Sequence, residues 1–390
     1  MEQIKKEMNR MENQKTLQDG AYRPTSLYFI GNGNPTGNDP SQNAQHALAQ
    51  NLLFLCRNRE RSARELAEET GVPLFYIEEE LKRQCEGVNG EYSLLRRTEW
   101  GRYIADILIA DKEEYETANR IYSQYASSFC GVLAAAVAAR QGEMQSFWRR
   151  NMQGDMDQSL LLWALLPDVI GSFIGQTGRE LKSAFGDVKP VDRPYTTVAV
   201  RGLAEPAFLY GGDSISAHDV CGYSDIMVRN LYGRRLKAHF HCDHDLAGDP
   251  LLQMVIRSVE GLPVQTLFEQ ERKIARQAIE QGYLRERDGV LEPAILVMGD
   301  GISVYIEFQS LLDGLEEETG ALTRALAGEL GKYMRRVMPI HLRKEYFYYN
   351  ACIAAHEFFD EVVEECIRRG ILNPPRDPLG PEGVLMVLCV

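Results

Sequence analysis

The stretch 62–111 constrains the fold of this chain more than any other, because its order of elements can be read directly. Ser62 precedes Glu65 by three residues, which is the capping-box spacing that begins a helix. Gly71 is suited to end that helix. The run 90–110 reads as two strands joined by a Thr-Glu-Trp-Gly turn. The sequence therefore predicts short helices followed by a two-stranded hairpin.

Helical spacing divides the helix after Gly71 into an inner and an outer face. Leu74, Ile77 and Leu81 recur every three or four residues, so we expect their face to be buried. Pro73 suits the start of this helix, and apolar spacing in 42–57 predicts another helix before the stretch. The outer face is left with aromatic, acidic and basic side chains, namely Phe75, Tyr76, Glu79, Glu80, Lys82 and Arg83.

Composition is that of an ordinary globular protein. The chain has 390 residues, 44% apolar and 25% charged, which is enough for two or three domains with sizeable cores. Helical periodicity dominates and strand-like alternation recurs in the middle, so we expect an α+β fold that is mostly helical. The formal net charge of -13 argues against non-specific coating of nucleic acid, which needs a concentrated positive surface. It does not exclude a locally basic surface.

Shifts in pattern predict four segments. Residues 1–40 form a flexible N-terminal segment, because 18–42 is rich in Gly, Asn and Pro. Residues 41–111 hold the helices and the hairpin. Residues 112–185 form a helical linker or assembly region, and 186–390 form a larger α+β domain for sensing or assembly.

The order of elements in 41–111 resembles the winged helix-turn-helix of bacterial transcription regulators such as the MarR and ArsR groups. The stretch 68–81, which contains Glu-Glu-Thr-Gly-Val-Pro and then Tyr-Ile-Glu-Glu-Glu-Leu, is also similar to winged-helix parts of some sigma-factor-like proteins of low-GC Gram-positive bacteria. The resemblance covers this segment alone. It implies a transcription regulator that inserts its second helix into the major groove of double-stranded DNA.

Eight residues are the DNA contacts that this resemblance implies. They are Phe75, Tyr76, Lys82, Arg83, Arg96, Arg97, Trp100 and Arg102. The hairpin arginines suit phosphate or minor-groove contacts, while the two aromatic residues of the helix supply shape or stacking contacts. The helix departs from the usual pattern, because Glu79 and Glu80 are repelled by phosphates. The alternatives are a protein-docking surface marked by the exposed aromatics, and a purely structural role.

A similar order of elements recurs within 250–312. Helical spacing in 270–281 is followed by Gly-Tyr-Leu and by a hairpin about Asp288-Gly289. A strand at 294–298 then leads into a further helix, as in the earlier segment. A second winged-helix-like unit is one interpretation of this pattern.

The string 239–244 matches the H-x-H-x-D-H pattern by which metallo-β-lactamase-like hydrolases bind zinc. By that resemblance His239 and His241 would hold one metal, and Asp243 with His244 another, with water as the nucleophile. The further ligands that those hydrolases need are incomplete downstream. Strand alternation alone also places His239, His241 and Asp243 on one polar face. A hydrolase, a structural or regulatory single-metal site and the absence of metal all stay open.

The remaining features indicate a non-enzymatic cytoplasmic protein. No nucleophilic triad or nucleotide-binding loop is supported, so zinc is the one cofactor left open. The N-terminus has no hydrophobic signal region, and eight cysteines without C-x-x-C spacing indicate reduced thiols. No apolar run reaches the roughly 20 residues that cross a bilayer, so no membrane contact is expected. The alanine-rich run 134–139 is a candidate seam for a homodimer.

Overall fold

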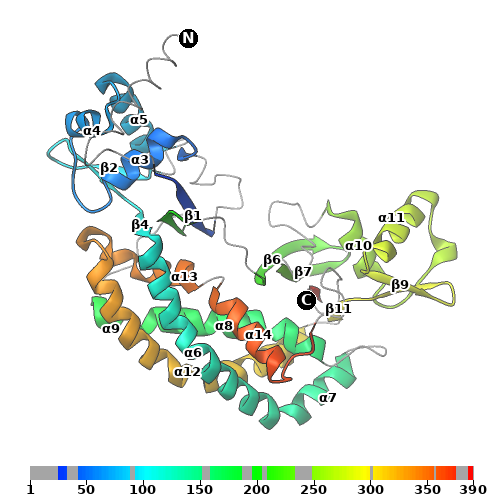
Figure 1. Cartoon of the computed structure of the whole chain (residues 1–390). Helices are drawn as coiled ribbons and strands as arrows, with labels where there is room; N and C mark the ends of the chain where they lie inside the picture. Colours follow the sequence, from blue (N-terminus) through cyan, green and yellow to red (C-terminus); the bar gives the residue numbers. More distant parts are fainter. Residues whose placement is uncertain are drawn as a thin grey trace. The chain divides into compact units, whose positions relative to one another are not determined.

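The computed structural model of the chain is mostly helical with several small sheets, which confirms the α+β prediction (Figure 1). It describes residues 25–32, 43–87, 93–151, 159–186, 196–203, 209–232, 248–298, 302–354, 357–374 and 385–389. The chain forms two compact units, and each is built from three separated segments. The four-segment division made from the sequence stays a prediction.

The first unit comprises 1–118, 181–206 and 331–353. Its N-terminal part carries helices and a hairpin where the sequence predicts them. Their bounds are α3 (Ala47–Leu55), α4 (Ala63–Thr70), α5 (Leu74–Glu86), β2 (Leu95–Arg97) and β3 (Tyr103–Ala105). β2 and β3 pair antiparallel, and Arg61, just before α4, forms an isolated antiparallel bridge with Tyr103. The second strand of the hairpin therefore has a neighbour on each side.

A second sheet of this unit has the order β1-β5-β4. Strand β5 (Thr196–Arg201) pairs antiparallel with β1 (Leu27–Asn32) and parallel with β4 (Leu108–Asp111). The sequence predicts one strand over 102–110, but the structure divides it between β3 and β4. The chain turns at Asp106, whose N–H donates to the carbonyl of Leu94, so β4 leaves the hairpin and joins β5.

Buried apolar side chains from the helices, the hairpin and the second sheet form one core in this unit. It includes Leu52, Leu53, Leu66, Ile77, Leu81, Leu94, Leu95, Ile107 and Ala199. The rest of the unit contains α9 (Lys182–Phe185), the 3-10 helix η3 (Ile340–Glu345), α13 (Tyr346–Ala354) and the ends of two long helices, α6 (Lys112–Ala139) and α12 (Ile302–Val337).

The second unit comprises 119–180, 207–330 and 354–390. Its helices are α7 (Gln141–Asn151), α8 (Ser159–Glu180), α14 (Glu357–Arg368) and the remaining lengths of α6 and α12. Aromatic rings connect three of these helices. The ring centroid of Phe173 in α8 lies 4.9 Å from that of Phe129 in α6 and 5.5 Å from that of Phe358 in α14. The apolar run 160–174 reads as a buried helix that Pro167 would interrupt. In the structure α8 continues through this residue.

A four-stranded sheet of this unit has the order β11-β12-β7-β6. β6 (Gly211–Val220) and β7 (Tyr223–Tyr232) form an antiparallel hairpin. β12 (Leu385–Cys389) pairs antiparallel with β7 and parallel with β11 (Leu296–Met298). The short apolar run 384–390 favours a final strand, and the structure confirms this with β12.

The segment 250–293 has an order of elements similar to that at 47–105, with a short strand and a 3-10 helix in place of α4. Its elements are α10 (Pro250–Arg257), β8 (Leu262–Pro263), the 3-10 helix η2 (Val264–Thr266), α11 (Glu269–Glu280), β9 (Leu284–Arg287) and β10 (Val290–Pro293). β10 pairs antiparallel with both β9 and β8. In Figure 1, α10 and α11 lie side by side near β9.

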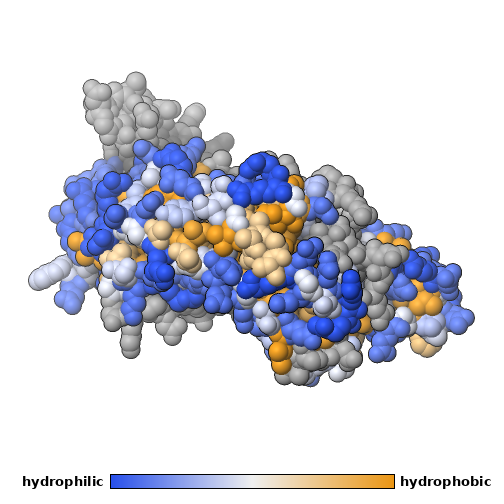
Figure 2. Space-filling model, turned by 90° about the horizontal axis from the view of Figure 1, so that it is seen from below, coloured by the Kyte–Doolittle hydropathy of each residue, from blue (hydrophilic) through white to orange (hydrophobic). Residues whose placement is uncertain are grey.

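The surface of the molecule is not uniformly polar. Figure 2 shows a mostly hydrophilic face with patches of apolar residues between the hydrophilic ones. Among the described residues, α6 alone is long and apolar enough to cross a membrane by length and composition. This is weak evidence, because a core helix can meet the same criterion. Within the alanine-rich run of α6, Ala136 is buried, whereas Ala135, Ala138 and Ala139 are exposed.

Candidate nucleic-acid interface

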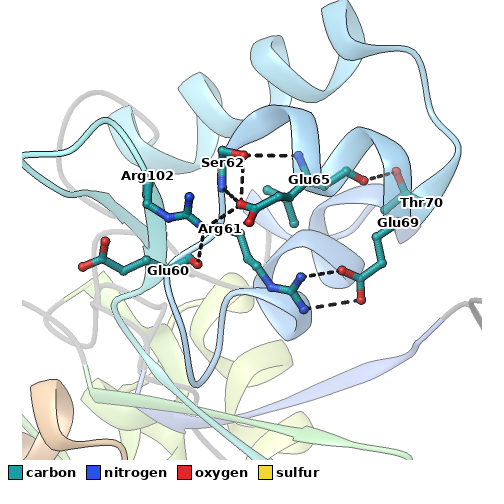
Figure 3. Close-up of polar contacts among 8 residues, drawn as sticks. Glu60, Arg61, Ser62, Glu65, Glu69, Thr70 and Arg102 are labelled. Carbon is teal, nitrogen blue, oxygen red and sulfur yellow. Dashed lines mark hydrogen bonds and ion pairs between the residues drawn. The ribbon is translucent and has the colours of Figure 1, made fainter.

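The entrance to α4 is fixed by the predicted capping box. The Ser62 hydroxyl accepts the backbone N–H of Glu65 at 3.2 Å, and the Glu65 carboxylate accepts the backbone N–H of Ser62 at 2.6 Å (Figure 3). At the other end Gly71 adopts φ 71°, where a side chain would be strained, and its N–H donates to the carbonyl of Ala67. These contacts set the direction in which the chain enters α5.

Arg102, one of the predicted DNA contacts, is held by this same cap. Its guanidinium donates to both Glu65 carboxylate oxygens, at 2.9 and 2.6 Å, and to the carbonyl of Glu60 at 3.0 Å (Figure 3). The hydrogen bond from Arg102, followed by those from Ser62, lowers the pKa of Glu65 to about 2. The hairpin is thereby tied to the start of α4, and Arg102 already has an anionic partner.

Arg61 makes a second tie within the segment. Its guanidinium lies 2.7 Å from the Glu69 carboxylate at the far end of α4 (Figure 3). Its backbone exchanges hydrogen bonds with Tyr103, at 2.9 and 2.7 Å. The sequence gives no sign of this residue's double role, because Arg61 reads there as one of several surface arginines.

The outer face of α5 presents aromatic rings at its first turn. Phe75 and Tyr76 are 62% and 54% exposed, and their rings meet edge to face with centroids 5.6 Å apart. Leu74, which helical spacing predicts to be buried with Ile77 and Leu81, is 38% exposed, so that prediction is wrong for the first turn of α5. Because exposed large apolar side chains that cluster indicate a surface that binds something, this turn is a candidate contact site.

The two predicted cations of α5 both face carboxylates of the same helix. Arg83 donates to Glu80 through two nitrogens, at 3.1 and 2.6 Å. Lys82 lies 3.8 Å from Glu86 and stays exposed. The exposed Glu79 adds a further carboxylate to this face. The face therefore offers an anion little net positive charge.

The hairpin turn brings three predicted residues together. Arg96 lies 3.6 Å from Asp106, and Trp100 is 83% exposed. Arg97 is also exposed, and none of the described residues forms an ion pair with it. Gly101 closes the turn at φ 70°, and its N–H donates to the carbonyl of Thr98. Arg97 is thus an exposed cation of this hairpin, and Trp100 is its most exposed ring.

Two cysteines of the segment are protected thiols. Burial raises the pKa of Cys56 to about 12 and that of Cys85 to about 11. Since the thiolate is the reactive form, neither side chain suits nucleophilic chemistry at neutral pH.

A group of exposed cations on α11, with exposed Glu269 and Glu280 beside it, is absent from the contacts predicted by sequence. Arg272, Lys273 and Arg276 are exposed, and so are Gln270 and Gln277. Ala275 and Ala278 are buried on the opposite side of the helix. The helical spacing of these cations is visible in the sequence, but their exposure depends on which side of α11 packs.

The predicted metal ligands His239, His241, Asp243 and His244 lie outside the described residues. Within the described part of the chain, no group of three or more His, Cys, Asp or Glu side chains is arranged to hold a metal ion. The zinc hypothesis stays a prediction.

Comparisons with known proteins identify no relative, so a proposal about function depends on the fold and its surfaces. No family model matches this chain, and neither curated proteins nor solved structures match it significantly.

Proposed function

We propose that this chain is a cytoplasmic DNA-binding transcriptional regulator whose segment 41–111 is a winged helix-turn-helix. The observation that carries the proposal is the hairpin strand β3, which pairs with β2 on one side and with Arg61, between α3 and α4, on the other. In winged helices a short strand between the first two helices joins the hairpin in this way. The larger second unit would sense a ligand or mediate assembly.

In this proposal the hairpin makes the electrostatic contact with DNA. Arg97 and Arg96 reach phosphates, and exposed Trp100 lies against the backbone or the minor groove. Phe75 and Tyr76 give shape contacts from α5. Arg102 and Arg83 have smaller roles than the sequence suggests, because each lies 2.6 Å from a carboxylate. Arg96 and Lys82 have looser pairs, at 3.6 Å from Asp106 and 3.8 Å from Glu86.

The test is a selection of binding duplexes from a random pool with the whole protein, followed by fluorescence anisotropy at several salt concentrations. We expect Arg96→Ala/Arg97→Ala to lower the slope of log K against log salt by about 2, because each phosphate contact contributes about 0.9. The matched control Arg149→Ala/Arg324→Ala removes two exposed cations outside the segment and keeps the slope. Selection that enriches no sequence would contradict the proposal.

A second candidate function is protein docking through α5. The exposed cluster Leu74, Phe75 and Tyr76, bordered by exposed Glu78 and Glu79, favours it, because aromatic residues are enriched in protein interfaces and carboxylates oppose DNA. A photoreactive amino acid at position 75 would then crosslink to a protein partner. Phe75→Ala/Tyr76→Ala would abolish binding to that partner and leave DNA affinity unchanged.

A further inference from the structure

Helix α11 packs through one side and leaves a regular stripe on the other. Its small buried residues, Ala275 and Ala278, face a core that includes Leu252, Val255, Leu284 and Leu291. On the opposite side Glu269, Lys273, Arg276 and Glu280 follow at intervals of four, three and four residues, so they form one exposed stripe.

The orientation of α11 is fixed by contacts at its first turn. The Glu271 carboxylate accepts the backbone N–H of Phe268 at 2.8 Å and a hydrogen bond from Arg257 of α10 at 2.8 Å. These two hydrogen bonds lower the pKa of Glu271. Arg257 of α10 thereby joins the start of α11, which sets the orientation of the exposed stripe relative to α10.

The cations of this stripe are available to an external anion. Arg276 donates to the carbonyl of Arg272 at 3.3 Å, and no described carboxylate pairs with either guanidinium. Lys273 lies 3.9 Å from Glu269, in an exposed pair that contributes little. Exposed pairs of this kind are readily exchanged for a phosphate partner.

Side chains that suit base edges flank the cations. Gln270 and Gln277 are exposed on the same helix, and a Gln amide can pair with the edge of adenine in the major groove. The hairpin after α11 turns at Asp288 (φ 54°) and Gly289 (φ 74°), which is the two-residue turn that matches strand twist. Exposed Arg287 stands at this turn.

We infer that α11 and its hairpin form a second contact with double-stranded DNA, with Lys273, Arg276 and Arg272 on phosphates and Gln270 or Gln277 at the bases. This inference rests on the proposed function, because it takes the repeated order of elements at 250–293 to be a second winged-helix unit. Glu269 and Glu280 limit the affinity, because they carry negative charge into the same stripe.

The test uses the whole protein and a fluorescein-labelled duplex of mixed sequence that spans several helical turns. Lys273→Gln/Arg276→Gln keeps good helix formers at exposed positions and removes two positive charges. We expect about tenfold weaker binding and a salt slope lower by about 2. Glu269→Gln/Glu280→Gln removes two negative charges from the stripe and is expected to strengthen binding by a similar factor. Circular dichroism checks that every variant is folded.

The controls separate this inference from the proposed function. Arg149→Ala/Arg324→Ala has the same change in net charge as the α11 variant and is expected to bind like the unmodified chain. If Arg96→Ala/Arg97→Ala weakens binding and the α11 variants do not change it, the α11 inference is wrong and the proposed function stands. If only the α11 variants change binding, the inference holds and the hairpin of 41–111 is not the DNA contact. If the unmodified chain binds no DNA, both are wrong.

Discussion

The outer faces of α5 and α11 use the same intervals of four, three and four residues but different side chains. On α5 the positions are Phe75, Glu79, Lys82 and Glu86, and on α11 they are Glu269, Lys273, Arg276 and Glu280. Each helix follows a shorter helical element and precedes an antiparallel hairpin. Similar backbones therefore present an aromatic, acidic stripe in one case and, in the other, a stripe with two exposed cations between two exposed carboxylates. Backbone arrangement alone does not determine what such a helix binds.

The inner faces differ as well, and the largest expected effects lie there. Leu81 is fully buried on α5, so Leu81→Ala should lower the free energy of unfolding by about 2–5 kcal/mol through lost burial and a cavity. The corresponding position of α11 is Ala275, and Ala275→Leu should cost about 1–3 kcal/mol by overpacking. Urea unfolding followed by circular dichroism measures both. The exposed control Glu79→Ala should change stability by less than about 0.5 kcal/mol. A harmless Ala275→Leu would mean that α11 does not pack closely.

Charge exchange on the outer faces tests whether both surfaces contact DNA. Lys273→Glu should weaken DNA binding by about tenfold or more, which corresponds to about 1.4 kcal/mol. Glu79→Lys on α5 should strengthen binding, because exposed Glu79 lies one turn from the proposed shape contact of Phe75 and its carboxylate is repelled by phosphates. Anisotropy titrations measure both. An unchanged affinity in Glu79→Lys would show that the outer face of α5 does not contact DNA and would favour its role in protein docking.

Removal of the N-terminal cap is expected to destabilise α4 and α10 by a similar amount. Ser62 caps α4, and Asp249 caps α10 by accepting the N–H groups of Leu251 and Leu252 at 2.8 and 3.0 Å. Ser62→Ala and Asp249→Ala should each lower the free energy of unfolding by about 1 kcal/mol. The conservative changes Ser62→Thr and Asp249→Asn serve as controls, since both keep a capping oxygen. Equal losses in the Ala and conservative variants would argue against capping as the cause.

Acid should lower the stability of segment 41–111 by protonating Glu65. Its pKa in the folded chain is lowered to about 2, so its contribution to stability is complete above the pKa of the unfolded chain and is lost as pH falls towards 2. Arg102→Gln removes the main cause of the shift, so the carboxyl group should then titrate nearer its ordinary pKa. Carboxyl NMR shifts followed through an acid titration measure the change. An unaltered Glu65 titration in Arg102→Gln would contradict the observed ion pair.

Local patterns in the sequence predicted many of the helix ends and turns in segments 41–111 and 250–312. The spacing of Ser62 and Glu65, the glycine at position 71 and the Asp288-Gly289 turn are all found as expected. These features depend on a few neighbouring residues, so they can be recognised without the rest of the fold. The course of the chain after Asp106 could not be recognised from the sequence, because β4 pairs with β5, which lies far along the chain.

The candidate site was predictable in part for the same reason. Exposure of Phe75, Tyr76 and Trp100 follows from helical spacing and turn chemistry. The ion pair of Arg102 with Glu65 cannot be predicted in this way, because Glu65 is distant in sequence and contacts Arg102 only when the hairpin folds beside α4. The cations of α11 are visible in the sequence, but their exposure on one side of the helix is not.

The sequence by itself determined where these helices begin and end, which turns join the strands, and that the fold is mostly helical. Capping, left-handed glycines and apolar periodicity act over a few residues, so they need no tertiary context. Only the tertiary structure decided which charges are neutralised by the chain and which stay available to a partner. That choice depends on side chains brought together from distant positions, as the Arg102–Glu65 pair and the exposed Arg276 illustrate.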